Sequence, residues 1–291
     1  MKRPDGRPSG RVGLIGQGLK HSLSAVMQQA ALDYHRVDAR YELWDTQPED
    51  IEQRVASLRL DDCLGANVTV PHKQAVIPFL DELDGVATRA GAVNTIVPRS
   101  GRLTGHNTDV TGFACALREA GFDVRGVRAA VRGAGGGARA VTLALIEGRA
   151  SVISIADAVP ARAEVLADDL RGLASAGTAV TWTPWGESAF QRAVRECELL
   201  VNCTPVGMRF GPAEGQSPVA ADLIPSGCLA FDLVYNPEQT PLLVAARSRG
   251  SRTAGGLAML VHQGAASFRL WTGLEAPVEL MFAAARKALA G

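Results

Sequence analysis

A lysine, an aspartate and several amide side chains occur in three short segments between residues 67 and 109. Lys73 ends the segment NVTVPHK, Asn94 lies in GAVNT, and Asp109 ends GHNTD. A lysine can act as an acid or a base if burial and neighbouring charges tune its pKa, and an ionised aspartate beside it would keep it charged and oriented. Because no metal ligands accompany them, these residue types suit proton transfer on a neutral polyol or ketone.

The segment that carries Lys73 also has a purely structural interpretation. In an expected strand over 65–70, Asn67 and Thr69 lie on one side by the period of two, and two valines take the other side. Lys73 would then open the next helix. A strand with one polar face and a surface lysine at its end would give the same pattern, and Asn and Asp are common in turns.

Two serines, Ser22 and Ser24, follow the first expected strand in the segment KHSLSA. Their hydroxyls could bind an anion or substrate hydroxyls, but a serine pair at a helix start is also typical of an N-cap. Ser-His-Asp catalysis lacks support, because the sequence contains no G-x-S-x-G elbow to present the serine.

A glycine-rich segment, VRGAGGGARA, is the second candidate site. Gly133, Gly135 and Ala138 match the pattern G-x-G-x-x-G/A, in which backbone N–H groups and a helix N-terminus approach a diphosphate. The pattern alone could be a simple turn. An expected strand before it, a helix over 138–148 and a second strand ending at Asp157 supply the context that dinucleotide binding requires.

Arg132 stands directly before the first glycine of this pattern. A charged residue at the end of a buried strand must point out of the sheet or pair with another group. The sequence does not identify that group.

The overall composition is that of an ordinary soluble globular protein, long enough at 291 residues for two domains. Lys+Arg and Asp+Glu are both 30, so no net charge attracts nucleic acid or an anionic membrane. No apolar run approaches the roughly 20 residues of a membrane span or the core of a signal peptide. We therefore expect a cytoplasmic protein with a loose tail over residues 1–10, and neither a nucleic-acid nor a membrane partner.

The five cysteines and five histidines are scattered along the chain. The cysteines form no C-x-x-C pair, and their odd number argues against a full disulfide framework. The histidines form no H-E-x-x-H motif and no cluster with cysteine at zinc spacing. We expect reduced, structural cysteines and no catalytic metal.

Strand and helix patterns alternate along most of the chain, which favours parallel strands joined by crossover helices. From residue 127 onward the expected strands are VRAAV, SVISIA, TAVTW, ELLVNCT and CLAFDLV, with helices over 138–148, 160–173 and about 187–195. In the first hundred residues, the expected strands are RVGLIG, RYELWD and GANVTV, with helices over 23–32, 48–59 and 72–80. Two long helical patterns, over 256–273 and 276–291, close the chain.

These patterns predict a two-domain α/β fold with a cleft between an N-terminal substrate lobe and a C-terminal Rossmann lobe, a doubly wound parallel sheet. The substrate-binding domain is expected over 1–108 and 255–291, and the dinucleotide-binding domain over 109–254. Ligands bind such parallel sheets at the carboxyl ends of the strands, where the glycine-rich segment falls.

The ordered motifs of this chain resemble those of the shikimate dehydrogenases, and look closest to the branch that includes NAD-dependent quinate/shikimate dehydrogenases. The resemblance spans nearly the whole chain. The matching strings are S-x-S at 22–24, NVTVPHK, GAVNT, GHNTD, GAGG at 133–136, NCTPVGM at 202–208, DLVYNPEQTPLL at 232–243 and GLAMLVHQGAASFRLWTG at 256–273.

The resemblance implies a role for each matching residue. Lys73 and Asp109 would handle the proton at the C3 oxygen of the substrate ring, while hydride passes to or from the nicotinamide. The implied substrate-binding residues are Ser22 and Ser24 at the carboxylate, and Asn67, Thr69, Asn94, Tyr235 and Gln263 at or near the ring hydroxyls. The implied cofactor-binding residues are Gly133, Ala134, Gly135, Gly136, Gly137, Asp157, Thr204, Pro205, Val206, Met208, Gly256 and Met259.

One departure from the family bears on the cofactor. Members that use NADP usually show N-R-T after the second strand, with the arginine pairing the 2′-phosphate, whereas this chain has Asp157 and Ala158. A carboxylate there accepts hydrogen bonds from a free ribose diol and repels a phosphate, which implies a preference for NAD over NADP. Arg139 or Arg162 could still supply charge to a phosphate.

Other departures bear on the substrate. After Ser24 the family often continues P-x-x-H-N, where this chain has Ala25, Met27 and Gln28, and the usual D-G before the last helices is replaced by small residues. The resemblance implies oxidation of shikimate to 3-dehydroshikimate in the shikimate pathway of aromatic amino acid biosynthesis. Quinate or an amino analogue is the alternative substrate, a nucleotide-sensing protein without turnover is the alternative of another class, and either a monomer or a homodimer is compatible.

Overall fold

The structure, a computed structural model, describes residues 10–174, 177–184, 186 and 188–290. The chain forms two compact units, one of Met1–Gly112 with Leu260–Gly291 and the other of Phe113–Met259. We call these the first and the second unit. Most of the expected tail, residues 1–9, lies outside the described residues, and Gly10 already belongs to the first strand.

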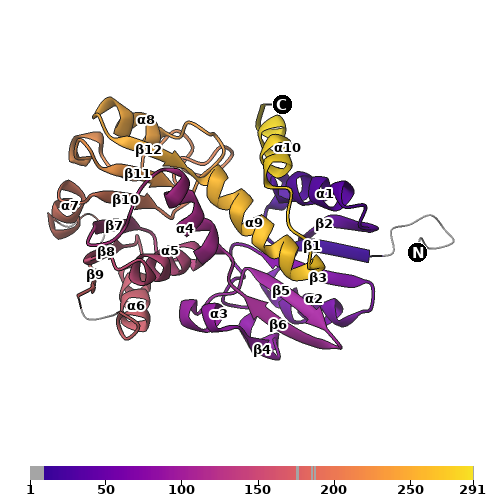
Figure 1. Cartoon of the computed structure of the whole chain (residues 1–291). Helices are drawn as coiled ribbons and strands as arrows, with labels where there is room; N and C mark the ends of the chain where they lie inside the picture. Colours follow the sequence, from indigo (N-terminus) through magenta and orange to yellow (C-terminus); the bar gives the residue numbers. More distant parts are fainter. Residues whose placement is uncertain (1–9, 175–176, 185, 187, 291) are drawn as a thin grey trace. The chain divides into compact units, whose positions relative to one another are not determined.

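The second unit is built on a six-stranded, fully parallel sheet (Figure 1). Its strands are β7 (Arg128–Arg132), β8 (Val152–Ala156), β9 (Ala179–Trp182), β10 (Leu199–Asn202), β11 (Leu229–Asp232) and β12 (Arg252–Gly255). The order β12-β11-β10-β7-β8-β9 means that the chain moves outward from β7 on one side and returns to β10 on the other. This is the doubly wound order of a Rossmann fold, so the predicted fold class is confirmed. The sixth strand, β12, was not among the expected ones.

Helices cover both faces of this parallel sheet, as its buried strands require. The helices of this unit include α5 (Gly136–Glu147), α6 (Pro160–Arg171), α7 (Ser188–Arg195) and α8 (Pro241–Ser248). Side chains of α7 and α8 share one apolar cluster with Ala130 of β7, Leu200 of β10 and Ala230 of β11, while α5 and α6 lie on the opposite side (Figure 1). Every residue of β10 and β11 is buried.

The first unit has a six-stranded mixed sheet. Its strands are β1 (Gly10–Gly16), β2 (Ala39–Asp45), β3 (Cys63–Val68), β4 (Glu82–Leu83), β5 (Thr95–Arg99) and β6 (Arg102–His106), in the order β2-β1-β3-β5-β6-β4. Strand β5 runs antiparallel to both neighbours. The β5–β6 hairpin turns at Ser100 and Gly101, both with positive φ, as a two-residue turn of type I′ requires. The sequence patterns predicted neither β5 nor β6.

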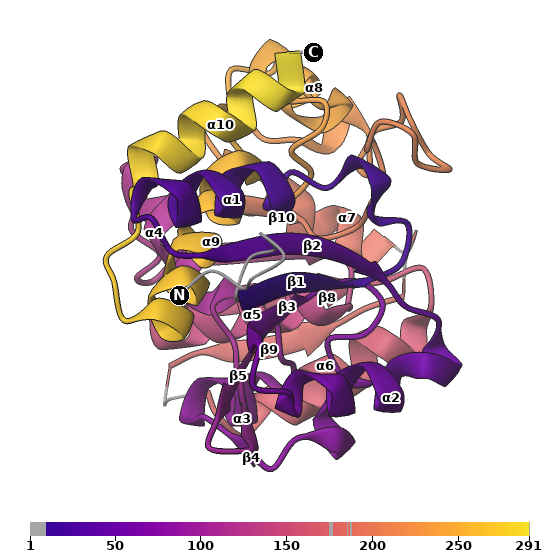
Figure 2. The same ribbon diagram turned by 90° about the vertical axis from the view of Figure 1, so that its right-hand side faces the viewer.

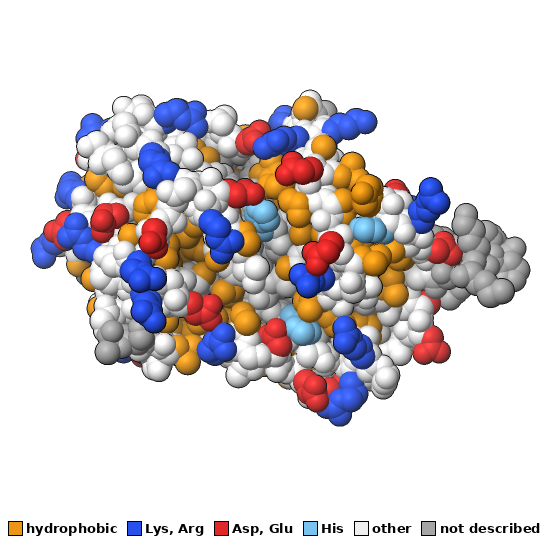
Figure 3. Space-filling view, viewed as in Figure 1, with side chains coloured by type: hydrophobic (Ala, Val, Ile, Leu, Met, Phe, Trp, Pro, Cys, Tyr) orange, Lys and Arg blue, Asp and Glu red, His pale blue; other side chains and the backbone are white. Residues whose placement is uncertain are grey.

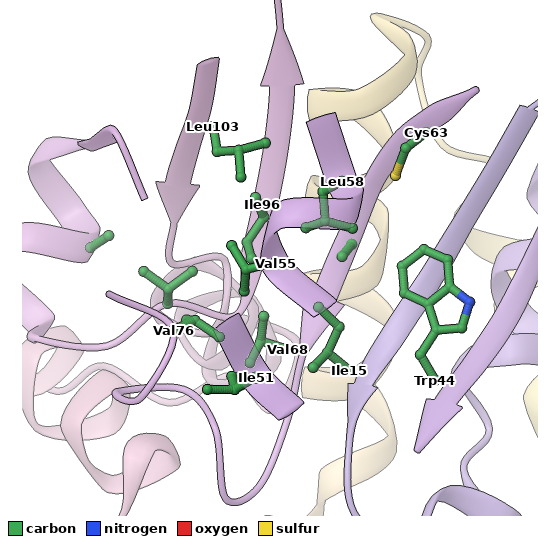
Figure 4. Packing of buried hydrophobic residues seen from close by; sticks show 13 residues of the cluster. Ile15, Trp44, Ile51, Val55, Leu58, Cys63, Val68, Val76, Ile96 and Leu103 are labelled. Atoms are coloured by element: carbon green, nitrogen blue, oxygen red, sulfur yellow. The ribbon is translucent and has the colours of Figure 1, made fainter. Parts of the chain in front are cut away.

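The helices of the first unit are α1 (Ser24–Tyr34), α2 (Ile51–Ala56), α3 (Gly85–Ala90) and α10 (Val278–Ala290), with α4 (Asp109–Glu119) and α9 (Gly256–Thr272) continuing across the unit boundaries. Figure 2 shows α1 and α10 side by side above β2. On the sheet, α2 contributes Ile51 and Val55 to a core with Ile15, Val68 and Ile96 (Figure 4). This packing holds the carboxyl ends of β1 and β3 in place, where the first candidate site lies.

Two expectations around Lys73 are wrong. The expected strand over 65–70 ends at Val68, and the expected helix over 72–80 is a series of turns followed by a short 3₁₀ helix, Ile77–Phe79. The Lys73 carbonyl accepts from Val93 N at 2.7 Å, so it is not available for a helical bond. Pro78 has no N–H to give to the carbonyl four residues earlier.

Candidate active site

Lys73 and Asp109 form a close ion pair in the first unit. Lys73 Nζ donates to Asp109 Oδ2 at 2.5 Å, and the two side chains are only 15% and 6% exposed. Solvent screens such a pair much less than it screens a surface salt bridge. A nearly buried ammonium held against a carboxylate is a group that can give or take a proton at a fixed position.

The loop around Lys73 is tied to two different strands. The backbone bond to Val93 connects it to the segment that leads into β5. On the other side, the buried ring of His72 donates from Nε2 to the Thr46 carbonyl at 2.8 Å, just after β2. These two bonds position Lys73 although it lies in no helix or strand.

Asp109 is the first residue of α4 and is positioned by Asn107. Asn107 Oδ1 accepts from the backbone N of Asp109 at 3.1 Å and of Val110 at 3.4 Å. Asn107 Nδ2 in turn donates to the Ala92 carbonyl at 2.8 Å. Asp109 therefore occupies the first turn of a helix, where the dipole is favourable for a carboxylate.

Asn94 holds the second oxygen of Asp109. Its Nδ2 donates to Asp109 Oδ1 at 2.8 Å and is also within hydrogen-bonding distance of Gln263 Oε1 at 3.2 Å. Its Oδ1 accepts from the backbone N of Thr108 at 2.7 Å. One carboxylate oxygen of Asp109 thus accepts from Lys73 and the other accepts from the Asn94 amide, and the two bonds fix the plane of the carboxylate.

Asn67 is at the centre of a second group of polar side chains. Tyr41 donates its hydroxyl to Asn67 Oδ1 at 2.8 Å, and Asn67 Nδ2 donates to the Asn94 carbonyl at 3.2 Å. Burial raises the pKa of Tyr41 above its usual range, and a hydrogen bond from Ser24 opposes that shift. Ser24, Tyr41, Asn67 and Asn94 therefore form one connected chain of hydrogen bonds.

Sequence reasoning did not assign a role to three hydroxyl residues of this network, Thr95, Thr108 and Ser267. Ser267 Oγ lies 2.7 Å from Thr95 Oγ1 and 3.0 Å from Thr108 Oγ1, and it accepts from Asn67 Nδ2 at 3.0 Å. All three residues are buried. Their only signal in the sequence is position, since each is adjacent to, or one helical turn from, a residue that was singled out.

The remaining expected substrate residues are less closely tied to the dyad. Ser22 is half-buried, and its Oγ accepts from the backbone N of Ser24 at 3.3 Å, at the start of α1. Thr69 is half-buried directly after β3, where its backbone N donates to the Ile15 carbonyl at 2.8 Å. Tyr235 is half-buried and belongs to the second unit, in the segment after β11.

The glycine-rich turn joins β7 to α5 at the point where the sheet order reverses. Gly133 has φ +109°, and a Cβ there would lie 3.1 Å from the backbone of Cys203, so only glycine fits without strain. Gly135 precedes α5 without a side-chain cap, and a Cβ there would enter open space. The first N–H groups of α5 have no helical acceptors, which suits an anion such as a diphosphate. Gly136 and Gly137 form the first residues of that helix.

Asp157 supports the glycine-rich turn from the next strand. Its Oδ2 accepts from Ala134 N at 2.8 Å and its Oδ1 accepts from Val159 N at 2.9 Å. Of the two arginines considered for a phosphate, Arg139 is buried and donates to Asp169 at 2.6 Å, whereas Arg162 is exposed.

The segment of Thr204, Pro205, Val206 and Met208 follows β10 at the same edge of the sheet. Asn202 Oδ1 accepts from the Thr204 backbone N and hydroxyl, and Asn202 Nδ2 donates to Asp232 Oδ1 at 2.8 Å. Burial raises the pKa of Asp232 to about 6. Asn202 and Asp232 support this segment, and sequence reasoning assigned no role to either side chain.

Gly256 and Met259 begin α9 within the second unit. A Cβ on Gly256 would clash with the Leu233 carbonyl oxygen, so glycine is needed for close packing of the helix start on the segment after β11. Met259 is buried, with 6% of its surface exposed.

Within the described residues, three further observations concern cofactors and surroundings. No group of three or more His, Cys, Asp or Glu side chains there could hold a metal ion. None of the described helices combines the length and apolar character needed to cross a membrane. All five cysteines are free thiols, and on the face in Figure 3 charged side chains of both signs are interspersed.

The sequence matches known proteins over nearly its whole length. Residues 14–96 match the model of the shikimate dehydrogenase substrate binding domain, and residues 256–286 match that of the shikimate 5′-dehydrogenase C-terminal domain. A shikimate dehydrogenase (NADP(+)) from Moorella thermoacetica is 43% identical, over 97% of this chain and 94% of its own. The chain belongs to the shikimate dehydrogenase family. The family prediction is therefore confirmed.

Two solved structures of this family are close in fold. The shikimate 5-dehydrogenase of Thermus thermophilus in complex with NADP(H) and shikimate superposes with a TM-score of 0.85 and 38% identity, covering 96% of this chain and 99% of that one. The quinate dehydrogenase of Corynebacterium glutamicum in complex with NAD has a TM-score of 0.85 and 34% identity, covering 95% and 98%. Members of the family are thus found with either nicotinamide dinucleotide.

Proposed function

We propose that this protein is a shikimate dehydrogenase, which interconverts shikimate and 3-dehydroshikimate by hydride transfer with NAD(P). The observation that carries the proposal is the nearly buried pair of Lys73 and Asp109 at 2.5 Å. Relatives that share most of the chain's length and bear the name shikimate dehydrogenase support it.

In this proposal the dyad moves the proton at the C3 oxygen of the ring. Lys73 donates a proton to that oxygen as a ketone becomes an alcohol, and accepts it in the opposite direction. Asp109 holds the ammonium in a fixed direction, and Asn94 fixes the plane of the Asp109 carboxylate. The nicotinamide dinucleotide supplies or accepts the hydride.

The remaining polar residues would hold the ring acid. Ser22 and Ser24 offer hydroxyls to the carboxylate, and Asn67, Thr69 and Gln263 offer groups to the ring hydroxyls. The hydrogen bonds that Asn67 makes with the Tyr41 hydroxyl and the Asn94 carbonyl support this assignment, because they hold Asn67 next to the residue that positions Asp109. Tyr235 is proposed to contribute from the second unit.

The dinucleotide is proposed to lie on the second unit, with its diphosphate at Gly133–Gly137 and its nicotinamide near Thr204–Met208, Gly256 and Met259. The open space at Gly135 and the first N–H groups of α5, which have no acceptor within the helix, fit that group. On this assignment, residues 109–254 are the cofactor-binding domain, and residues 1–108 with 255–291 bind the ring acid.

We further propose that NAD is preferred over NADP. Asp157 and Ala158 stand where arginine would pair a 2′-phosphate, and a carboxylate can instead accept from the ribose diol. Several similar relatives are named as NADP(+) enzymes, so we expect a preference rather than exclusion.

Quinate is the second candidate substrate, because a quinate dehydrogenase with NAD is among the structures of similar fold. The two ring acids differ by a hydroxyl at C1, which needs space and a hydrogen-bond partner in the site.

A matrix of shikimate and quinate against NAD and NADP tests these proposals together. The highest kcat/KM is expected for shikimate with NAD. Higher efficiency with quinate would reassign the substrate, and higher efficiency with NADP would reject the cofactor preference. Tight NADH binding without turnover of either ring acid would instead indicate a nucleotide-sensing protein.

A further inference from the structure

Arg132 is a charged residue buried at the carboxyl edge of the second unit's sheet. It ends β7, in register with Ala156 of β8 and Asn202 of β10, and only 5% of its surface is exposed. The next residue, Gly133, begins the glycine-rich turn. Burying a guanidinium is costly unless a charge or a ligand compensates it, so this position calls for a reason.

Asp157 provides part of that compensation from the neighbouring strand. It directly follows Ala156, the residue paired with Arg132, and its carboxylate accepts from Ala134 N in the turn at 2.8 Å. Burial lowers the pKa of Arg132 to about 10, while the carboxylate of Asp157 opposes that shift. The guanidinium therefore remains charged at neutral pH, and it lies close enough to the acidic group beside the turn to feel its charge.

This charge matters for a nucleotide bound on the turn. A lone carboxylate at the end of the second strand repels a 2′-phosphate, but a fixed positive charge beside it reduces that repulsion, and does so most effectively where water is excluded. Other cations are less suited, because Arg139 is engaged with Asp169 and Arg162 is exposed to solvent.

We propose that Arg132 is a specificity-determining residue, whose charge offsets Asp157 and allows the adenosine-ribose site to accept a nucleotide that carries a 2′-phosphate. This inference rests on the proposed dinucleotide site. On this proposal, Asp157 favours NAD, and the charge of Arg132 lets the phosphorylated nucleotide bind as well.

Two nucleotide fragments test the proposal without nicotinamide or ring acid. Binding of 2′,5′-ADP and of 5′-AMP to the full chain is measured by isothermal titration calorimetry. Arg132→Met is expected to weaken binding of 2′,5′-ADP about tenfold, the size of effect typical of one charged interaction. The affinity for 5′-AMP is expected to change less than about twofold. Arg132→Lys, which keeps the charge, is expected to retain most of the 2′,5′-ADP affinity.

Two further variants complete the design. Arg128→Met removes an exposed arginine at the opposite end of the same strand and is expected to leave both affinities unchanged. Asp157→Asn is expected to strengthen binding of 2′,5′-ADP relative to that of 5′-AMP. Added to Arg132→Met, it is expected to restore the wild-type ratio of the two affinities. If Arg132→Met does not fold, Arg132→Gln, which removes the charge but keeps a polar side chain, is measured in its place with the same expected loss of 2′,5′-ADP affinity.

Several results would overturn the proposal. They are an unchanged affinity ratio in Arg132→Met, an equal loss for both fragments, or an unchanged ratio in Asp157→Asn. The outcome is separable from that of the proposed function. A wild-type chain that binds neither fragment rejects the dinucleotide site itself, whereas the choice of ring acid does not affect fragment binding.

Discussion

At the scale of single residues, the site depends on charges that are held by hydrogen bonds rather than exposed to water. Lys73 and Asp109 come from segments 36 residues apart, yet both are fixed by backbone or amide contacts of their own. The geometry argues against the alternative interpretation, a surface lysine at a strand end, because only 15% of the Lys73 side chain is exposed.

Lys73→Ala is expected to lower kcat by about 10² to 10⁴, the range for loss of a general acid–base group, while NAD affinity changes less than about twofold. The measurement is steady-state kinetics with shikimate, together with NADH binding by fluorescence. Lys287→Ala, at an exposed lysine of α10, is the matched control. Normal turnover in Lys73→Ala would contradict the dyad.

Asp232 predicts a dependence of stability on pH. Burial raises its pKa from 3.8 to about 6, so the folded protein favours the protonated form, and this contribution to stability is lost as pH rises from about 4 to about 6. Asp232→Asn should remove that loss. The difference in free energy of unfolding between Asp232→Asn and wild type should shift by about 2 kcal/mol in favour of the folded variant between pH 4.5 and pH 7. Urea unfolding at both pH values checks this, and parallel changes in the two proteins would argue against it.

At the scale of elements, the glycine-rich turn combines two different requirements. Gly133 is required by the fold, since its φ is +109° and the Cys203 backbone is close. Gly135 has an extended conformation with φ −82° that any residue can adopt, and space for a Cβ. Glycine at 135 is therefore explained by a ligand, not by folding.

Gly135→Ala is expected to leave the melting temperature unchanged or slightly raised and to weaken NAD binding by about tenfold or more, because the methyl group occupies space needed by the diphosphate. Calorimetry gives the affinity and thermal unfolding gives the stability. Gly172→Ala, at another glycine with open space around its Cβ, should change neither quantity. If Gly135→Ala binds NAD with the wild-type affinity, the diphosphate does not bind at this turn.

At the scale of the whole molecule, the two units are proposed to bind different ligands. Hydrogen exchange measured by mass spectrometry should show that NAD alone protects the turn at 133–137 and the segment at 204–208. Shikimate alone should protect segments around 67–73, 94 and 107–109. Protection of the first unit by NAD alone, with none in the second, would reverse the assignment.

Much of the doubly wound sheet follows from local patterns, because alternating apolar strands and helices leave few ways to bury both faces. The glycine spacing and Asp157 were likewise recognisable, since the turn and its support lie within one β–α–β segment. Strand β12 was not, because its four residues form a strand only by pairing with β11.

The sequence by itself determined the alternation of strands and helices, the position of the glycine-rich turn and the residue types of the dyad. Each of these depends on neighbours close in the chain. Only the tertiary structure decided that Lys73 lies in a turn, because its carbonyl bonds to Val93, and that Ser267 of α9 joins Thr95 and Thr108. These contacts join segments distant in sequence, so no local pattern records them.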